Sequence, residues 1–141
     1  MASRVVFARL CDRVIILSDS VDAVTADDAG AVVSFSGIVR NHDDGHAVTL
    51  LEYEAHPSAA DTLRSVAESV SADYPETRIA IEHRTGTLEV GDLALACAVS
   101  AAHRADAFAA CARLVDEVKR RVPIWKRQHF ADGTTEWVGA L

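Results

Sequence analysis

The apolar run Leu93–Ala101 (LALACAVSA) is the feature that most constrains the fold of this chain. A stretch without charged side chains, introduced by the turn-forming pair Gly91-Asp92, is typical of a strand that lies inside a sheet. The run is far shorter than the roughly 20 apolar residues that a helix needs to cross a bilayer. A buried strand needs covering layers, so we expect helices packed on a sheet and no membrane segment.

Patterns on both sides of this run predict the remaining elements. Alternating apolar and polar residues indicate strands over 30–40 (GAVVSFSGIVR), 49–55 and 78–85. Helical spacing indicates one helix from Pro57-Ser58 to Tyr74-Pro75 and a longer one over Arg104–Arg121. The shorter segments are two β-rich runs within 4–17, a short helix from Ser18 or Asp19 to Thr25, a polar loop at 41–46, and a hairpin of 125–130 with 134–138. We therefore expect a single α+β domain, residues 1–141, with two main helices on a mixed, mostly antiparallel sheet.

Composition and charge limit the classes of partner and the cellular location that we expect. Half of the 141 residues are hydrophobic and 25% are charged, as is usual for one soluble globular domain. The formal net charge of −7 disfavours nucleic acid as a partner. No basic stretch at the N-terminus precedes a continuous apolar one, so we expect no signal peptide and a cytoplasmic protein. The three cysteines, Cys11, Cys97 and Cys111, lack metal-ligand spacing, so we expect reduced thiols and no metal.

Lysine is rare in this chain and is confined to one basic segment. The 14 basic residues are twelve arginines and two lysines, Lys119 and Lys126. A guanidinium stays protonated, whereas a desolvated ammonium can lose its proton and act as a base or a nucleophile. On a helical wheel Lys119 lies about 20° from Phe108, so we expect it to point toward the core side and to be partly desolvated. The alternative is a stem laid on apolar surface with the amine in water.

The second lysine can join the first. Pro123 stops the long helix, and the extended segment 124–127 can fold back beside the turn that carries Lys119. Both amines would then lie at one pocket rim, with Trp125 as an apolar wall. An exposed Lys126 on an ordinary strand is the alternative.

Three further residues are candidates for binding an anion. His103 and Arg104 stand at the start of the long helix, where free backbone N–H groups attract negative charge. Arg40 ends the strand over 30–40 beside the polar loop. A plain N-terminal turn is the ordinary explanation for the first two.

Taken together, these segments resemble the MoaE family, the large catalytic subunits of molybdopterin synthase. The matching segments are GAVVSFSGIVRNH (30–42), LEYEAHP (51–57), IEHRTGTLEVGD (81–92), VSAAHRADAF (99–108), VKRRVPIWKRQ (118–128) and Trp137-Val138. They cover about residues 30–138, in the order and approximate spacing of the family. The resemblance implies an α/β-hammerhead fold, which is compatible with the expected α+β class.

The resemblance also implies an activity and partners. The family transfers sulfur from the thiocarboxylated C-terminus of a small ubiquitin-like sulfur-carrier subunit to cyclic pyranopterin monophosphate. This step forms the dithiolene of molybdopterin in molybdenum cofactor biosynthesis and is implied to need neither a metal nor another cofactor. The large subunits are implied to form a homodimer within a heterotetramer that carries a small subunit at each end.

The same resemblance assigns roles by position. Lys119 and Lys126 match the catalytic lysines, His103 and Arg104 match the substrate-contacting pair, and Arg40 matches the arginine that ends the strand. Lys119 is then the candidate for proton transfer or for stabilising the thiocarboxylate, and Lys126 assists by charge and proton donation. Arg127 holds the phosphate or flanks the pocket.

Two other functions are compatible with the same residues. A lyase could use Lys119 to form a Schiff base with a carbonyl substrate, although the sequence offers no carboxylate beside this lysine. A non-catalytic anion-binding or scaffold paralogue could keep the fold without the reaction, although both lysines are present.

Overall fold

The computed structural model describes residues 4–139 and shows, within them, three helices and two sheets. The α+β class expected from the sequence is confirmed. In chain order the elements are β1 (Val5–Cys11), α1 (Leu17–Val24), β2 (Ala31–Ile38), β3 (His42–Asp43), β4 (His46–Ala55), α2 (Ala59–Asp73), β5 (Arg78–Arg84), β6 (Gly86–Glu89), β7 (Leu93–Ala101), α3 (Arg104–Arg121), β8 (Ile124–Phe130) and β9 (Thr135–Val138). Between residues 4 and 139, none of the helices has the length and apolar character needed to span a membrane.

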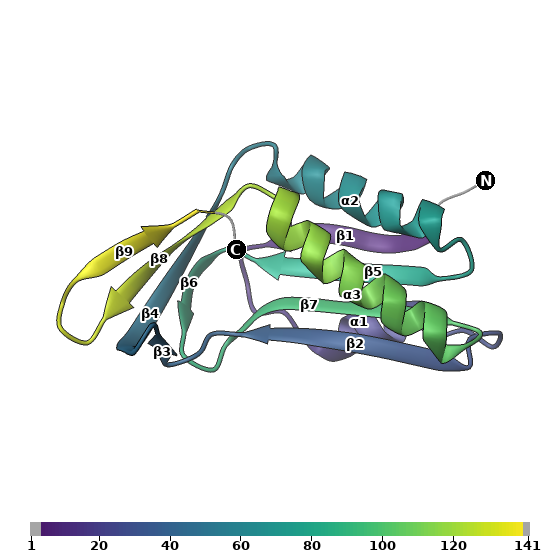
Figure 1. Cartoon of the computed structure of the whole chain (residues 1–141), viewed down its shortest axis with the longest axis horizontal. Helices are drawn as coiled ribbons and strands as arrows, with labels where there is room; N and C mark the ends of the chain where they lie inside the picture. The colour runs from purple at the N-terminus through teal and green to yellow at the C-terminus, as the bar shows by residue number, and fades with distance from the viewer. Residues whose placement is uncertain (1–3, 140–141) are drawn as a thin grey trace.

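The first sheet is covered by helices on both faces. Its strand order is β1-β5-β7-β2, with β1 parallel to β5 and the other neighbours antiparallel. Helices α2 and α3 lie side by side on one face, and α1 lies on the other (Figure 1). The inner strands β5 and β7 are therefore buried along most of their length, which explains the uninterrupted apolar run Leu93–Ala101.

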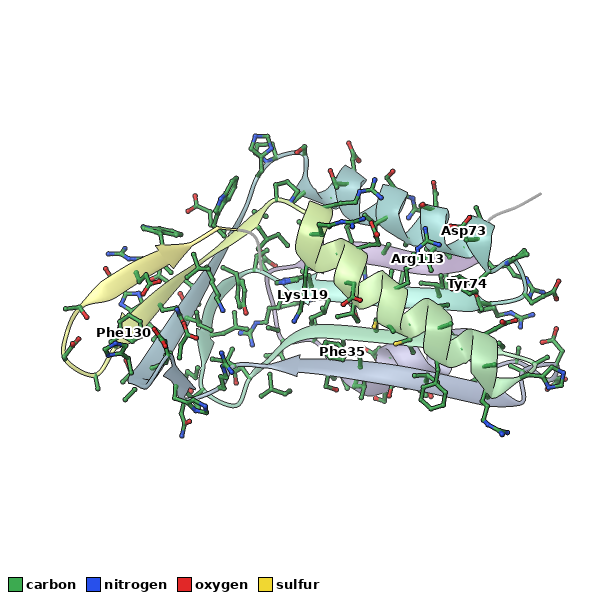
Figure 2. All side chains as sticks on the ribbon, viewed as in Figure 1. Phe35, Asp73, Tyr74, Arg113, Lys119 and Phe130 are labelled. Atoms are coloured by element: carbon green, nitrogen blue, oxygen red, sulfur yellow. The ribbon has the colours of Figure 1, made fainter. Side chains whose placement is uncertain are left out.

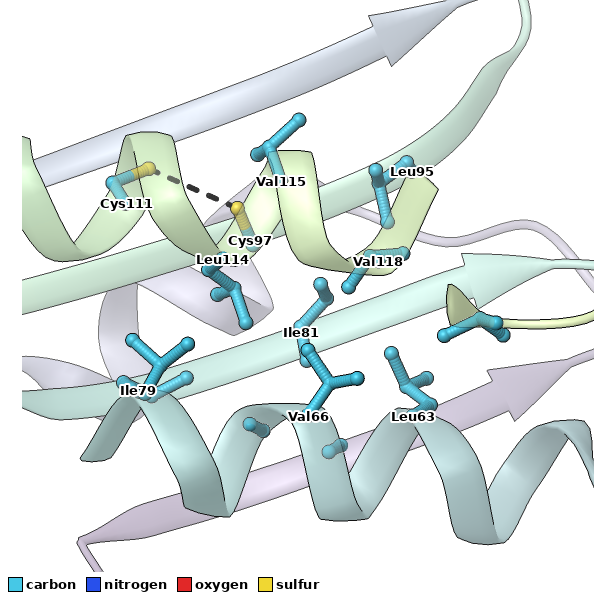
Figure 3. Packing of buried hydrophobic residues seen from close by; sticks show 14 of the residues in the cluster. Leu63, Val66, Ile79, Ile81, Leu95, Cys97, Cys111, Leu114, Val115 and Val118 are labelled. Carbon is cyan, nitrogen blue, oxygen red and sulfur yellow. Dashed lines mark hydrogen bonds between the residues drawn. The ribbon is translucent and has the colours of Figure 1, made fainter. Parts of the chain in front are cut away.

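The main core fills the space between this sheet and the pair α2 and α3. Leu63 of α2 and Leu114 of α3 are fully buried there, against Ile79 and Ile81 of β5 (Figure 3). On the opposite face the central positions of β5 and β7 carry small side chains, Ala80 and Ala98. Ala80 and Ala98 pack against Val24 and so let α1 lie close to the sheet.

The second sheet is antiparallel and joins the end of the first. Its strand order is β3-β4-β8-β9, and β6 pairs with β4 beside this path. The chain passes from the first layer into this sheet three times, from β2 to β3, from β5 to β6 and from α3 to β8 (Figure 1). A separate small core holds the junction and contains Val39, Leu51, Leu88 and Ala94.

The structure corrects three of the expected elements. The expected single sheet is two sheets. The short helix expected from Ser18 or Asp19 to Thr25 is confirmed as α1 (Leu17–Val24). The apolar run at 14–17 is not a strand: Val14 and Ile16 are exposed, and α1 begins at Leu17. The polar loop at 41–46 is a hairpin between β3 and β4, whose turn residues Asp44 and Gly45 both have positive φ, 49° and 78°. The run at 14–17 was assigned wrongly because periodicity alone does not show whether four apolar residues form a strand or precede a helix.

Candidate active site

A cavity of about 420 Å³ lies where the two sheets meet, and we call it the junction pocket. It is bounded by the ends of β2 and α3, the start of β7, and strands β4, β5 and β8. The lining residues are Phe35, Ser36, Gly37, Ile38, Val39, Arg40, Leu51, Tyr53, His83, Ala94, Leu95, Lys119, Lys126 and Gln128. The structure thus brings together three residues that the sequence singled out: Lys119, Lys126 and Arg40.

Lys119 projects from the last turn of α3 over Phe35 of β2 (Figure 2). Its Nζ lies 5.9 Å from the centre of the Phe35 ring, within the range of cation–π attraction. The prediction that Lys119 is partly desolvated is wrong for this chain, because the side chain is exposed. The helical wheel was centred on Phe108, which is 61% exposed, whereas the buried side of α3 carries Leu114 and Val118. Lys119 therefore lies at the margin of the buried stripe, toward β2.

The last turn of α3 carries three basic residues, and Lys119 differs from the other two in its ion pairing. Arg120 and Arg121 both form ion pairs with Glu117 on the same helix. Lys119 forms no ion pair within residues 4–139, so its charge is available to a ligand.

Lys126 is the more desolvated of the two amines. It extends from β8 opposite Tyr53 of β4 and is half-buried in the junction pocket. Burial lowers its pKa below the ordinary lysine value of 10.5, and the positive charges of Arg40 and Lys119 act in the same direction, while Asp43 opposes them. Because Lys119 and Lys126 both line this pocket, one ligand can contact both amines.

Arg40 is held at the rim of the pocket by a carboxylate. Its Nη2 donates a hydrogen bond to Oδ1 of Asp43 at 3.1 Å, and Nε2 of the buried Gln128 donates to Oδ2 at 2.8 Å. The bond from Gln128, and then the charges of Lys126 and Arg40, lower the pKa of Asp43. Asp43 is thus a stable anion, and Arg40 remains exposed enough to offer its other N–H groups to a ligand.

Two aromatic residues of the pocket were not singled out from the sequence. His83 of β5 is 1% exposed, and Tyr53 of β4 packs against it edge-on, with ring centroids 5.1 Å apart. Burial lowers the pKa of His83 to about 4 and raises that of Tyr53 above 10.0. The available signal was the alternation in 78–85, which places His83 on the same face as Ile79 and Ile81.

The remaining predicted residues lie outside the junction pocket of this chain. His103 precedes α3 and Arg104 begins it, so both are exposed at the end of the helix opposite to Lys119, about 22 Å away along its axis. Arg127 alternates with Lys126 along β8 and faces the other side of the second sheet, where its guanidinium carbon lies 5.8 Å from the centre of the Trp137 ring.

The chemistry of the pocket is that of an anion site with an apolar wall. Arg40 and the two lysines supply positive charge and hydrogen-bond donors, and Phe35 and Tyr53 supply flat apolar surface. Residues 4–139 contain no cluster of three or more His, Cys, Asp or Glu side chains that could hold a metal ion. Fold and pocket together define an α+β protein with an amine-lined cleft suited to an anionic ligand that has a flat part.

The chain belongs to the MoaE protein family, whose model matches residues 11–121. It is 39% identical over 131 residues to the molybdopterin synthase catalytic subunit of Halalkalibacterium halodurans, covering 92% of this chain and 83% of that protein. It is 40% identical over 134 residues to the molybdopterin synthase catalytic subunit 1 of Mycobacterium tuberculosis, covering 94% and 90%. The X-ray structure of molybdopterin synthase from Staphylococcus aureus matches with a TM-score of 0.88 at 33% identity, over 94% of this chain and 96% of that one. The family resemblance drawn from the sequence is confirmed.

Proposed function

We propose that this chain is the catalytic subunit of a molybdopterin synthase, a sulfurtransferase of molybdenum cofactor biosynthesis. It transfers sulfur from the thiocarboxylated C-terminus of a small ubiquitin-like subunit to cyclic pyranopterin monophosphate and so builds the dithiolene of molybdopterin. The observation that carries the proposal is the convergence of Lys119, Lys126 and Arg40 on one cavity in a chain of this family.

The substrate phosphate and the reacting atoms both require positive charge. Arg40, oriented by Asp43, binds phosphate oxygens through the N–H groups that it does not give to the carboxylate. Each attack by sulfur develops negative charge on the atom that leaves, and the ammonium groups stabilise that charge in a partly dry site. The ring of Phe35 supports the flat heterocycle.

The two lysines divide the work according to their exposure. Lys126 has the lowered pKa and is the better group for proton transfer, because its ammonium gives up a proton more readily than an ordinary lysine. Lys119 is exposed at the mouth of the pocket and meets the incoming thiocarboxylate, whose negative charge it neutralises. This assignment exchanges the emphasis that the sequence gave to the two residues.

The proposal includes a dimer and a cytoplasmic location. His103 and Arg104 are too far from Lys119 to touch the same ligand within one chain. They join the site when a second copy presents the start of its α3 to the junction pocket, and the homodimer then binds one small subunit per site in a heterotetramer. In that compartment the thiols stay reduced. The three cysteines, Cys11, Cys97 and Cys111, are free thiols, which is compatible with this location.

Reconstitution tests the function directly. The purified chain is mixed with a thiocarboxylated small subunit and cyclic pyranopterin monophosphate, and molybdopterin is assayed. We expect product with the wild-type chain, a loss of at least about 100-fold for Lys119→Ala, and partial activity for Lys119→Arg if charge alone is required. Absence of product with the wild-type chain, or unchanged activity of Lys119→Ala, would refute the proposal.

The same preparations address the two competing functions. Borohydride reduction in the presence of a small aldehyde or ketone traps a Schiff-base lysine, and covalent capture at Lys119 would favour the lyase. A chain that binds the precursor but yields no product with any thiocarboxylated small subunit would be the non-catalytic paralogue.

A further inference from the structure

The floor of the junction pocket contains a buried histidine to which the mechanism above gives no role. His83 is 1% exposed and lies on β5 between the apolar core and the cavity that it lines. Tyr53 packs edge-on against its ring, at an interplanar angle of 77°. The ring is therefore held in one orientation relative to the lysines above it.

The hydrogen bond of His83 fixes its protonation. Nδ1 lies 2.8 Å from the backbone carbonyl oxygen of Arg84, and a carbonyl oxygen can only accept, so Nδ1 carries the hydrogen. Burial, opposed only by this bond, lowers the pKa of His83 to about 4. The ring is neutral at pH 7, and Nε2 is left with a lone pair.

That lone pair has no partner in the protein. Nε2 makes no hydrogen bond within residues 4–139, although the side chain is almost completely buried. The cations of the pocket, Lys119, Lys126 and Arg40, are donors only. A ligand that offers both an anionic group and N–H hydrogens would satisfy the donors with one end and His83 with the other.

We propose that His83 positions the substrate by accepting, through Nε2, a hydrogen bond from a ring N–H or amino group of the reduced pterin. The heterocycle then enters with its N–H edge toward the floor, while its phosphate remains with the cations at the rim. The identity of the heterocycle rests on the proposed function. His83 is in this role a positioning and specificity residue, since it neither donates to nor receives a proton from the reacting atoms.

Two amide variants separate recognition from structure. In His83→Asn the amide nitrogen takes the place of Nδ1 and keeps the bond to Arg84, but the acceptor at the pocket floor is lost. In His83→Gln the amide oxygen reaches the place of Nε2, so the acceptor is kept and the bond to Arg84 is lost. We expect His83→Asn to raise the KM for cyclic pyranopterin monophosphate roughly tenfold, with kcat within about twofold of wild type, and His83→Gln to retain a KM closer to wild type.

A structural role predicts the opposite order. If His83 served the fold alone, His83→Gln would be the more impaired variant and both would lose kcat and thermal stability together. That order, or an unchanged KM in His83→Asn, would overturn the proposal.

The protonation of the two His83 ring nitrogens can be measured by NMR on the wild-type chain. In ¹⁵N-histidine-labelled protein at pH 7 we expect the His83 signals of a protonated Nδ1 and an unprotonated Nε2, with the Nε2 signal shifting when the precursor is added. A protonated Nε2, or a signal that saturating precursor does not move, would overturn the proposal. Failure of the proposed function is distinguishable, because the wild-type chain then yields no molybdopterin and binds no precursor, which excludes the pterin as the ligand of His83.

Discussion

At the scale of single residues, Lys126 carries a charge at a half-buried position, where a neutral side chain would give a more stable fold. Burial places its folded-state pKa below that of the unfolded chain. Below the folded-state pKa the charged amine lowers the free energy of unfolding by a constant amount. This penalty falls as the pH rises past the folded-state pKa and is gone above the ordinary value of 10.5. The same burial that makes the amine useful for proton transfer therefore weakens the fold.

We expect Lys126→Met to raise stability while it removes activity. The apolar replacement keeps the stem and removes the half-buried charge, so the free energy of unfolding at pH 7 should increase by about 0.5 kcal/mol. Urea unfolding at constant m-value measures the change. Lys119→Met is the matched control, since it removes an exposed amine and should leave stability unchanged within error. A clear loss of stability in Lys126→Met would contradict the assignment.

The buried His83 makes the fold sensitive to acid. Its pKa is about 4 in the folded chain against an ordinary value of 6.5, so the unfolded chain takes up the proton first as the pH falls. Its contribution to stability is complete above pH 6.5 and is lost as the pH falls toward 4, to a total of roughly 3 kcal/mol.

Unfolding of wild type and His83→Asn at two pH values measures this effect. We expect the wild type to lose roughly 2 kcal/mol more than the variant between pH 7 and pH 4.5. Exposed carboxylates with a lowered pKa, such as Asp28 and Asp132, titrate in both proteins and cancel in the difference. Equal acid sensitivity of the two proteins would show that His83 is not a buried neutral group.

The sequence predicted some of these residues and could not predict others. The two lysines stood out because lysine is otherwise absent from a chain rich in arginine. The half-burial of Lys126 depends on pairing with Tyr53, a residue more than seventy positions earlier in the chain, and no local pattern contains that information. His83 lay within an expected strand, where a buried histidine cannot be distinguished by periodicity from an apolar neighbour.

At the scale of elements, the spacing of apolar residues predicted where helices and strands lie but not which side of α3 packs on the sheet. The expected boundaries of the long helix and of the buried strand agree with α3 (Arg104–Arg121) and β7 (Leu93–Ala101). The orientation of α3 was misjudged because Phe108, its largest apolar residue, lies outside the buried stripe. Which side of a helix packs on a sheet is decided by the other layer, which sequence spacing does not describe.

The contact between the start of β2 and the end of β7 yields a prediction at this scale. A Cβ on Gly30 would lie 2.6 Å from the backbone carbonyl oxygen of Ala102, just before α3, and backbone cannot move aside as a side chain can. We expect Gly30→Ala to lower the free energy of unfolding by roughly 1–3 kcal/mol. In Gly139→Ala the new Cβ would meet only the Trp125 ring, at an ordinary 3.5 Å, so this control should be neutral. Equal unfolding midpoints for the two variants would contradict the close approach.

At the scale of the whole molecule, the site exists because two sheets meet. Lys119 comes from a helix that covers the first sheet, Lys126 from a strand of the second, and Arg40 from the connection between them. Local patterns predicted the longer helices and strands but placed the strands in a single sheet, which has no such junction. The length of α3 sets a further limit, because it holds Arg104 and Lys119 at opposite ends.

Mixing two impaired variants tests whether the site is completed by a second copy. Lys119→Ala removes the amine at one end of α3, and Arg104→Ala removes the guanidinium at the other. If sites are shared in a homodimer, each mixed dimer retains one site with both groups, and co-expression should restore roughly a quarter of wild-type molybdopterin formation at limiting precursor. If each chain completes its own site, every pocket lacks one group and no activity returns. The pair Lys119→Ala and Lys126→Ala is the matched control: both residues line the same pocket of the same chain, so their mixed dimers contain no intact site and should remain inactive under either arrangement.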